Sequence, residues 1–309
     1  MDNNTVFLFS GQGSQYAGMG KELVERFPQL KSIYDIASEI LGFELAKKCW
    51  EGSDEELAQT IISQPAIMAT SLVAYDAAVL SNITCTAVAG HSLGEYAAMV
   101  ASGILTMEDG FKVIKARASA MQKAAELSKG AMCAVMGKTA QEIEEICASI
   151  DGYVVPVNYN SSAQTVIAGE IDAVEKAAEK FTEVGAKAIK LKVSAAFHSK
   201  LMQPAADEFK EAIKDIEFFK PQMKFFSNLT GAELTDINDM PSKLAMHIVS
   251  PVRFTAELET LSSLGYTNYV ELGPNKVLTG LVKKTLKGVN SLNIENEATL
   301  DKAVETLLK

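Results

Sequence analysis

The sequence lacks the features that mark several large classes of protein. No apolar run approaches the roughly 20 residues that span a bilayer, which argues against a membrane protein. No block of Lys or Arg offers a phosphate footprint, and the formal charge of −10 argues further against nucleic-acid binding. The N-terminus "MDNNTVFLFS" has no basic segment before its apolar residues, so we expect no signal peptide.

Cysteine and histidine are also scarce. The four cysteines lie far apart and form no Cys-x-x-Cys pair, which argues against a zinc or disulfide framework. Reduced thiols of this kind fit a cytoplasmic protein, and we expect that location. Histidine occurs only at His91, His198 and His247, so a catalytic histidine has few candidates.

The order of expected elements predicts an α/β fold with two parts. The chain has 309 residues, 48% of them apolar, which is enough for a large core. Between 129 and 194 the pattern is β-α-β-β-α-β, the ferredoxin-like order. Its strands are expected at 131–137, 153–160, 164–170 and 186–193, and its helices at 139–150 and 172–185. We therefore predict a small domain at 129–194, inserted into a large domain with a parallel sheet formed by 1–128 and 195–309.

The segment "AGHSLGEY" (89–96) contains a Gly-x-Ser-x-Gly motif between an expected strand and an expected helix. In that context the glycines let the strand and the helix pass closely around a strained serine. The N-terminus of the helix also favours negative charge near the hydroxyl. A plain tight turn with a capping serine is the alternative. The flanking strand and helix favour Ser92 as a nucleophile.

A nucleophilic serine needs a base. His91 directly precedes Ser92, and the turn should direct it away from the hydroxyl. His198 lies where the last strand of the small domain meets a new helix, expected to begin near Ser199. A helix N-terminus disfavours the cationic form of a histidine and keeps it able to accept a proton. An ordinary surface or capping histidine is the alternative, but beside Ser92 we predict His198 as the base.

Arg117 lies on an expected helix, 107–127, on one stripe with Ile114 and Met121. Such an arginine can extend to the surface or pair with a structural carboxylate. It can also hold a substrate carboxylate with two hydrogen bonds. The spacing alone does not decide between these roles.

The glycine-rich loop "SGQGSQ" (10–15) follows the first expected strand. It matches neither a Walker A loop nor Gly-x-Gly-x-x-Gly, so phosphate binding is not expected. We expect this loop to form part of an oxyanion hole instead. Its donors would be the backbone N–H of Gln12 and the N–H of Leu93, the residue after the serine.

Several motifs occur in a fixed order along the chain. They are "GQGSQ", "GHSLGEY", Arg117, "NYNSSAQTVIAG", "VSAAFHS", "SPVRF" and "ELGPNKVLTGL". Together they resemble the malonyl-CoA:acyl carrier protein transacylases, from about residue 5 to residue 285. The resemblance implies an α/β-hydrolase-like large domain with an inserted ferredoxin-like small domain, the same division as the pattern predicts.

The resemblance also implies a role for each matching residue. It implies that Ser92 is the nucleophile and His198 its catalytic partner, that Gln12 and Leu93 supply the oxyanion hole, and that Arg117 binds the malonyl carboxylate.

Further residues are expected to contact the substrate. Asn160 matches a polar residue near the active site, and Phe197 matches the Ala-Phe-His pattern associated with malonyl rather than methylmalonyl selection. Met121, on the stripe of Arg117, is expected to contact the substrate as well. His247 is included with them, although its position favours an ordinary half-buried helix residue.

The sequence departs from the family pattern at three positions. Ser10 replaces a usual Pro, and Asn275 replaces a common Gly, with an effect expected only on a surface turn. His247 replaces a common Gln, at a place where the family's backbone carbonyl orients the catalytic histidine.

The implied reaction moves the malonyl group from malonyl-CoA to the phosphopantetheine thiol of holo-acyl carrier protein, through malonyl-Ser92. It exchanges one thioester for another, so we expect no metal and no cofactor. The protein is expected to be a monomer that supplies fatty acid biosynthesis. Lysines that could dock the acidic carrier, or simply be solvated, are Lys190, Lys192, Lys283, Lys284 and Lys287.

Three alternatives remain open at this point. A discrete acyltransferase of a polyketide assembly line would carry the same motifs. An acyl-thioester hydrolase is disfavoured because esterase triads place their histidine late in the chain. A carrier-binding scaffold with a dead site is disfavoured because both Ser92 and His198 are in place.

Overall fold

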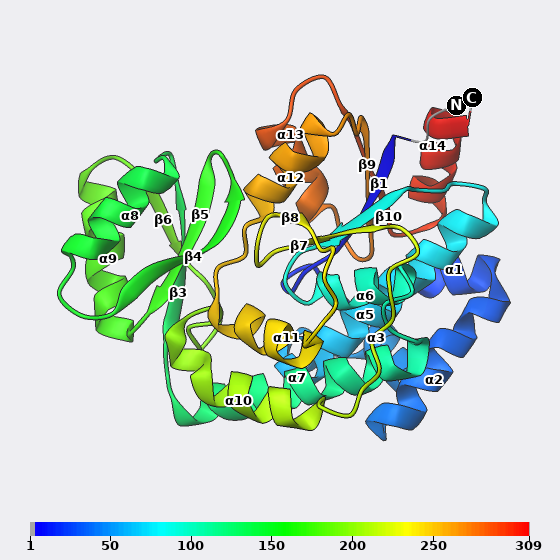
Figure 1. The fold of residues 1–309 in the computed structure, drawn as a ribbon, viewed down its shortest axis with the longest axis horizontal. Helices are drawn as coiled ribbons and strands as arrows, with labels where there is room; N and C mark the ends of the chain where they lie inside the picture. Colours follow the sequence, from blue (N-terminus) through cyan, green and yellow to red (C-terminus); the bar gives the residue numbers. More distant parts are fainter. Residues whose placement is uncertain (1–3, 309) are drawn as a thin grey trace.

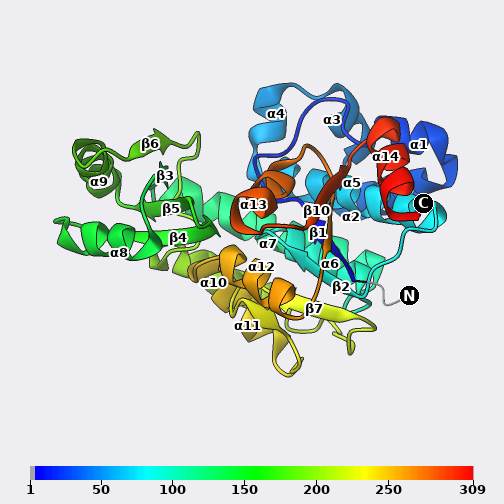
Figure 2. The same cartoon turned by 90° about the horizontal axis from the view of Figure 1, so that it is seen from above.

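The computed structural model describes residues 4–308 and contains two β-sheets, each flanked by helices (Figure 1). The larger sheet lies among most of the helices, and the smaller sheet forms a lobe at one end of the molecule with two helices of its own (Figure 2). This arrangement confirms the predicted α/β class with a large and a small sheet.

The large sheet has six strands. Their order is β10 (Asn290–Ile294), β9 (Asn268–Leu272), β1 (Thr5–Phe9), β2 (Ala87–Gly90), β7 (Lys224–Ser227) and β8 (Ala232–Glu233). Neighbouring strands from β10 to β7 are parallel, as predicted, and the short edge strand β8 is antiparallel to β7. The central strand β1 is fully buried and, apart from Thr5, apolar, as expected of a parallel strand covered on both faces.

Helices cover both faces of this sheet. They are α1 (Lys21–Arg26), α2 (Lys31–Leu41), α3 (Leu45–Glu51), α4 (Asp54–Ala58), α5 (Thr60–Leu80), α6 (Gly94–Ala101), α7 (Met107–Leu127), α10 (Gln203–Ala212), α11 (Met240–Val249), α12 (Phe254–Ser263), α13 (Val277–Thr285) and α14 (Glu297–Leu308), with 3-10 turns at Pro28–Leu30 and Lys200–Met202. Phe7 and Phe9 pack on the face shared with α5, α6 and α7, whereas Val6 and Leu8 pack against α12 and α13. No helix within residues 4–308 is long and apolar enough to cross a membrane.

The small sheet is antiparallel. Its order is β4 (Val154–Ser161), β5 (Gln164–Gly169), β3 (Ala131–Met136) and β6 (Lys187–Lys190). Helices α8 (Ala140–Ser149) and α9 (Ile171–Glu183) cover one face, and Met132 and Val166 on the other face join the main core. The chain order β3-α8-β4-β5-α9-β6 confirms the predicted ferredoxin-like pattern. The residue limits of two separate domains stay a prediction.

One expected strand is shorter than predicted. The strand expected at 186–193 ends at Lys190, so Lys192 is not part of the ladder. Leu191 still donates its N–H to the carbonyl of Met132 at 2.9 Å, and the chain then leaves the sheet. The alternating lysines predicted a longer strand because their pattern is local. The chain leaves the sheet because the residues after Lys190 line a pocket next to Ser92, which is a tertiary contact.

The two sheets are joined near that pocket. Val252 donates its N–H to the carbonyl of Val157 at 2.8 Å and accepts from the N–H of Tyr159 at 2.9 Å. On the other side of the lobe, the N–H of Gly130 bonds the carbonyl of Ser194 at 3.1 Å. The two bonds of Val252 fix the small sheet against the segment that follows α11.

Two glycines allow β1, β2 and α6 to approach closely. A Cβ on Gly94 would lie 2.1 Å from the carbonyl oxygen of Phe9, and a Cβ on Gly90 would lie 2.2 Å from the carbonyl carbon of Gly94. No side chain can occupy either space unless the backbone moves. The glycines of the motif are therefore required by packing.

We predict that Gly94→Ala lowers the free energy of unfolding by about 1–3 kcal/mol or more, because the added methyl group overpacks backbone atoms. Gly280→Ala is the matched control. Gly280 lies inside α13, and a Cβ there meets no atom within 4 Å. That control should stabilise the protein by about 0.5–1 kcal/mol. Urea unfolding of the two variants measures the difference, and equal effects would contradict the packing argument.

Candidate active site

Ser92 lies in a sharp turn between β2 and α6. Its φ is 53°, a left-handed backbone conformation that residues other than glycine rarely adopt. Holding a serine in this conformation costs about 1–3 kcal/mol. The N–H of Ser92 donates to Oδ1 of Asn228 at 2.7 Å, which holds the turn from the adjacent strand. The sequence context therefore predicted the turn correctly.

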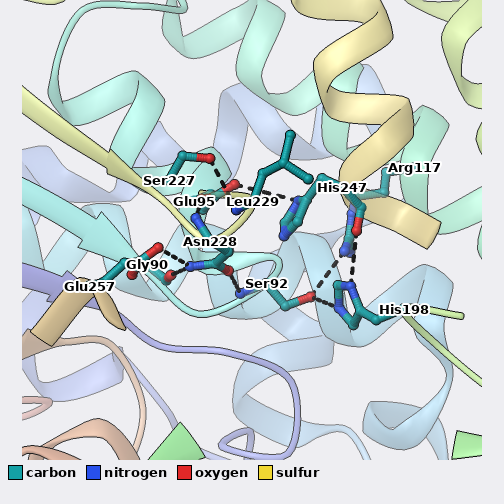
Figure 3. Close-up of polar contacts among 10 residues, drawn as sticks. All are labelled: Gly90, Ser92, Glu95, Arg117, His198, Ser227, Asn228, Leu229, His247 and Glu257. Carbon is teal, nitrogen blue, oxygen red and sulfur yellow. Dashed lines mark hydrogen bonds and ion pairs between the residues drawn. The ribbon is translucent and has the colours of Figure 1, made fainter. Parts of the chain in front are cut away.

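The structure brings Ser92 and His198 together (Figure 3). Oγ of Ser92 lies 2.7 Å from Nε2 of His198, and Nδ1 of His198 lies 3.0 Å from the carbonyl oxygen of His247. A carbonyl only accepts, so Nδ1 carries the proton and Nε2 is left to accept from the serine hydroxyl. The pair can move a proton from Ser92 to His198.

The environment of His198 keeps its imidazole neutral. Burial, together with the nearby Arg117 cation, lowers the pKa of His198 to about 3. The helix start predicted near Ser199 is present as a 3-10 turn, which Ser199 caps before α10 begins. The predicted effect of a helix dipole is nevertheless not the main cause, since burial and a real cation dominate.

Arg117 extends from α7 toward the nucleophile. Its side chain is 1% exposed, and Nη2 donates to Oγ of Ser92 at 3.0 Å. Its guanidinium also lies over the ring of Tyr96, 5.2 Å from the ring centroid. Within residues 4–308, Arg117 forms no salt bridge, and its Nε has no hydrogen-bond partner. An arginine that reaches the surface or pairs with a structural carboxylate is therefore excluded.

A pocket of about 390 Å³ opens above Ser92. Its lining residues are Gln12, Gly13, Gln15, Ala58, His91, Ser92, Met121, Met132, Asn158, Leu191, Lys192, Val193, Phe197 and His198. The pocket thus contains the expected substrate contacts Met121 and Phe197. It lies between the large sheet and the small one, and it is closed on one side by the segment that leaves β6.

The two expected oxyanion donors lie beside Ser92. Gln12 lines the pocket after β1, and Leu93 is the N-cap residue of α6. Neither backbone N–H donates to another atom within residues 4–308. Both groups are therefore available to a ligand, which is the condition for the predicted role.

Asn160 and His247 are not among the residues that line the pocket, so their predicted contact with the substrate stays a prediction. Oδ1 of Asn160 lies 2.7 Å from Nε2 of His91, so Asn160 supports a pocket residue. This bond also directs His91 away from Ser92, as predicted. The ring of His247 faces Glu95, and only its backbone carbonyl reaches the catalytic pair.

Asn228 and Glu257 are site residues that the sequence analysis missed. Nδ2 of Asn228 donates to the carbonyl of Gly90 and to Oε1 of Glu257, each at 2.7 Å. Asn228 follows β7, as Ser92 follows β2 and Gln12 follows β1. The rule that sites lie at the carboxyl ends of parallel strands could have identified Asn228.

Asn275 affects more than a surface turn, contrary to our expectation. Its φ of 65° explains why a glycine suits this position. Its side-chain Nδ2 donates to the carbonyl of Ser14 at 2.8 Å, and its N–H donates to Glu295 at 2.8 Å. Asn275 therefore anchors the loop that carries Gln12.

Comparison with known proteins decides the family. The model of the acyl transferase domain matches residues 6–304. A malonyl CoA-acyl carrier protein transacylase of Bacillus subtilis is 39% identical over 98% of this chain and 96% of that protein. This chain belongs to the acyl transferase family. The resemblance inferred from the motifs is thereby confirmed.

Solved structures of this family share the fold. The malonyl CoA-acyl carrier protein transacylase of Clostridium perfringens has a TM-score of 0.94 and 37% identity, covering 98% of this chain and 97% of the other. A malonyl-transacylase in complex with a type II polyketide acyl-carrier protein has a TM-score of 0.93 and 33% identity, covering 98% and 99%. The acyl transferase fold therefore extends over almost the whole chain.

We predict that acylation of Ser92 persists at mildly acidic pH. A pKa of about 3 leaves His198 neutral, and it protonates only as the pH falls toward that value. At about pH 5.5, a histidine with the ordinary pKa of about 6.5 would be about 90% protonated. Single-turnover acylation measured against pH should keep most of its plateau there. An acid limb centred near the ordinary value would contradict the burial argument.

Proposed function

We propose that this acyltransferase moves a malonyl group from malonyl-CoA to the phosphopantetheine thiol of holo-acyl carrier protein, in support of fatty acid biosynthesis. One observation carries the proposal: a fully buried, unpaired Arg117 reaches the hydroxyl of a serine that bonds a neutral histidine. The names of the relatives, including one solved with a carrier protein, support the same reaction.

In the first half-reaction, Oγ of Ser92 attacks the thioester carbonyl carbon while His198 accepts the hydroxyl proton at Nε2. The carbonyl oxygen becomes an oxyanion, and the N–H groups of Gln12 and Leu93 stabilise it. Loss of one such donor typically costs about 3–4 kcal/mol. The carbon–sulfur bond then breaks, and the CoA thiolate takes the proton from His198. Malonyl-Ser92 remains.

The second half-reaction reverses these steps with a new thiol. The phosphopantetheine thiol gives its proton to His198 and attacks the ester carbon of malonyl-Ser92. The oxyanion forms again at the same donors. The ester bond breaks, and Oγ of Ser92 recovers the proton from His198. The sequence is ping-pong and conserves every proton.

Arg117 selects the acyl group in this proposal. Its Nη2 donates to Oγ of Ser92, and its Nε has no hydrogen-bond partner among the described residues. The malonyl carboxylate lies two bonds from the ester carbonyl carbon, and in this proposal it accepts hydrogen bonds from the guanidinium. An acetyl group leaves the buried guanidinium without a partner, which carries a desolvation penalty. Met121 and Phe197 line the apolar part of the pocket and limit the size of the acyl group.

Two of the lysines expected to dock the carrier differ in their surroundings. Lys192 lines the pocket, whereas Lys190 bonds Glu175 at 2.6 Å. Lys192 therefore suits an anionic group on the phosphopantetheine arm or on the carrier better than Lys190 does.

We place the protein in the cytoplasm on the grounds of its free cysteines. The monomeric state stays a prediction.

A polyketide assembly line is the second candidate consumer of the malonyl group. The relative solved with a polyketide carrier favours it, since it shares the fold over 98% of this chain. The chemistry at Ser92 is the same in both cases. Comparing kcat/KM for a fatty acid carrier and for a polyketide carrier distinguishes the two pathways.

We predict that malonyl-CoA alone acylates Ser92. Intact-mass analysis of the wild-type protein should show one malonyl adduct, because no carrier thiol is present to remove it. Ser92→Ala should show none. Holo-carrier protein should discharge the adduct quickly and water only slowly. Rapid release of free malonate would indicate a hydrolase instead.

We predict that Arg117→Ala lowers malonyl transfer by about 100-fold or more, since removing one partner of a buried ionic contact costs about 3–5 kcal/mol. Acetyl transfer should survive or rise, because acetyl has no carboxylate. Arg117→Lys is the matched control; it keeps the charge but loses the planar fork, so its effect should be intermediate. Parallel assays with malonyl-CoA and acetyl-CoA measure the ratio. An equal loss for both substrates would contradict the carboxylate contact.

A further inference from the structure

Behind the pocket, the catalytic pair belongs to a closed ring of polar contacts (Figure 3). From Ser92, the N–H donates to Oδ1 of Asn228 at 2.7 Å, and the N–H of Asn228 donates to Oε1 of Glu95. Oε2 of Glu95 lies 3.4 Å from Nδ1 of His247. The carbonyl of His247 accepts from His198, whose Nε2 closes the ring at Oγ of Ser92.

Within this ring, Glu95 lies between Asn228 and His247. It lies on the first turn of α6, and its N–H donates to the carbonyl of Ser92 at 3.1 Å. Its carboxyl is 1% exposed and makes no hydrogen bond to Arg117, the nearby cation. A buried carboxyl without a salt-bridged cation is a poor contribution to stability. Its position instead links Asn228, which holds the backbone of Ser92, to His247, which holds the ring of His198.

Asn228 and His247 lie at the ends of different elements. Asn228 follows β7 and fixes the backbone of the nucleophile, whereas His247 lies in the last turn of α11 and fixes the ring of His198. Within residues 4–308, neither ring nitrogen of His247 has a hydrogen bond of regular geometry. Its side chain therefore has Glu95 as its polar neighbour, together with the ring of His198 at 5.3 Å.

Burial determines the protonation of this contact. It raises the pKa of Glu95 to about 8, and it lowers the pKa of His247 well below its usual value. Both shifts favour an uncharged pair, with the proton on the carboxyl and an acceptor nitrogen on the imidazole. A protonated carboxyl can accept from Asn228 with one oxygen and donate to His247 with the other.

We propose that Glu95 is a positioning residue that aligns Ser92 through Asn228 and His198 through His247. It touches neither the substrate nor the reacting atoms. The proposal rests on the proposed function, because alignment matters only if Ser92 and His198 exchange a proton. A misplacement of about 1 Å between reacting groups can cost about 100-fold in rate, so a link of this kind affects catalysis directly.

The test compares two substitutions of the same side chain. Glu95→Gln keeps the shape, one acceptor oxygen and one donor, so its kcat should stay within about threefold of wild type. Glu95→Ala removes both contacts, so its kcat should fall by about 10–100-fold. The KM for malonyl-CoA should change little, since Glu95 does not line the pocket.

A second readout separates alignment from substrate binding. Phenylmethylsulfonyl fluoride reacts with an activated serine and carries neither a carboxylate nor a CoA group. Its rate of reaction with Ser92 should fall for Glu95→Ala in parallel with kcat. Tyr34→Phe is the control for a lost buried hydrogen bond, because Tyr34 bonds Thr70 at 3.0 Å on other helices. Tyr34→Phe should lower Tm and leave both rates unchanged.

Several outcomes would overturn the proposal. A folded Glu95→Ala with wild-type kcat would do so, and so would a Glu95→Gln as slow as Glu95→Ala. If Glu95→Ala does not fold, His247→Leu removes the same contact from the other side while keeping the backbone carbonyl. An unchanged serine reactivity in that variant would also overturn it.

The failure of the proposed function would look different. A wild-type protein that forms no adduct with malonyl-CoA would refute malonyl transfer. The sulfonyl fluoride rates of wild type, Glu95→Ala and Glu95→Gln would still decide the positioning role of Glu95.

Discussion

The left-handed turn at Ser92 is the constraint on which the rest of the structure depends. The turn raises the hydroxyl above the ends of β1 and β2, and it exists only because glycines let backbone pass within contact distance on both sides. Asn228 then fixes the strained residue from the neighbouring strand. The sheet, the helix N-terminus and the pocket are arranged around this one conformation.

Electrostatics at the site follow from the burial of Arg117. A guanidinium without a carboxylate partner raises the potential around Ser92 and helps to keep His198 neutral. In the proposed reaction, the same cation binds a substrate that brings its own negative charge. On that proposal, affinity for the acyl group and the protonation of His198 share a physical origin, and a change at Arg117 affects both.

Much of the fold and of the candidate site could be predicted from the sequence, and the features that could not be predicted have physical causes. The strand and helix pattern predicted both sheets, and the motif predicted Ser92, because these signals are local. The scarcity of histidine and the family pattern predicted His198, but neither indicated that Asn160 bonds His91 or that the ring of His247 faces Glu95. That depends on side-chain direction between segments distant in sequence. Asn228 was missed for the same reason, and β6 was overextended because its exit toward the pocket is a tertiary effect.

The low basicity of His198 has a consequence for the charge that the site carries. Burial and the Arg117 cation keep the imidazole neutral, so Arg117 is the cation that the site carries at rest. In the proposed reaction, His198 becomes a cation only while it holds a proton in transit between Ser92 and a thiol. A second buried cation beside Arg117 is costly at low dielectric, which favours release of the proton to the departing group. The site thus passes protons on and does not store them.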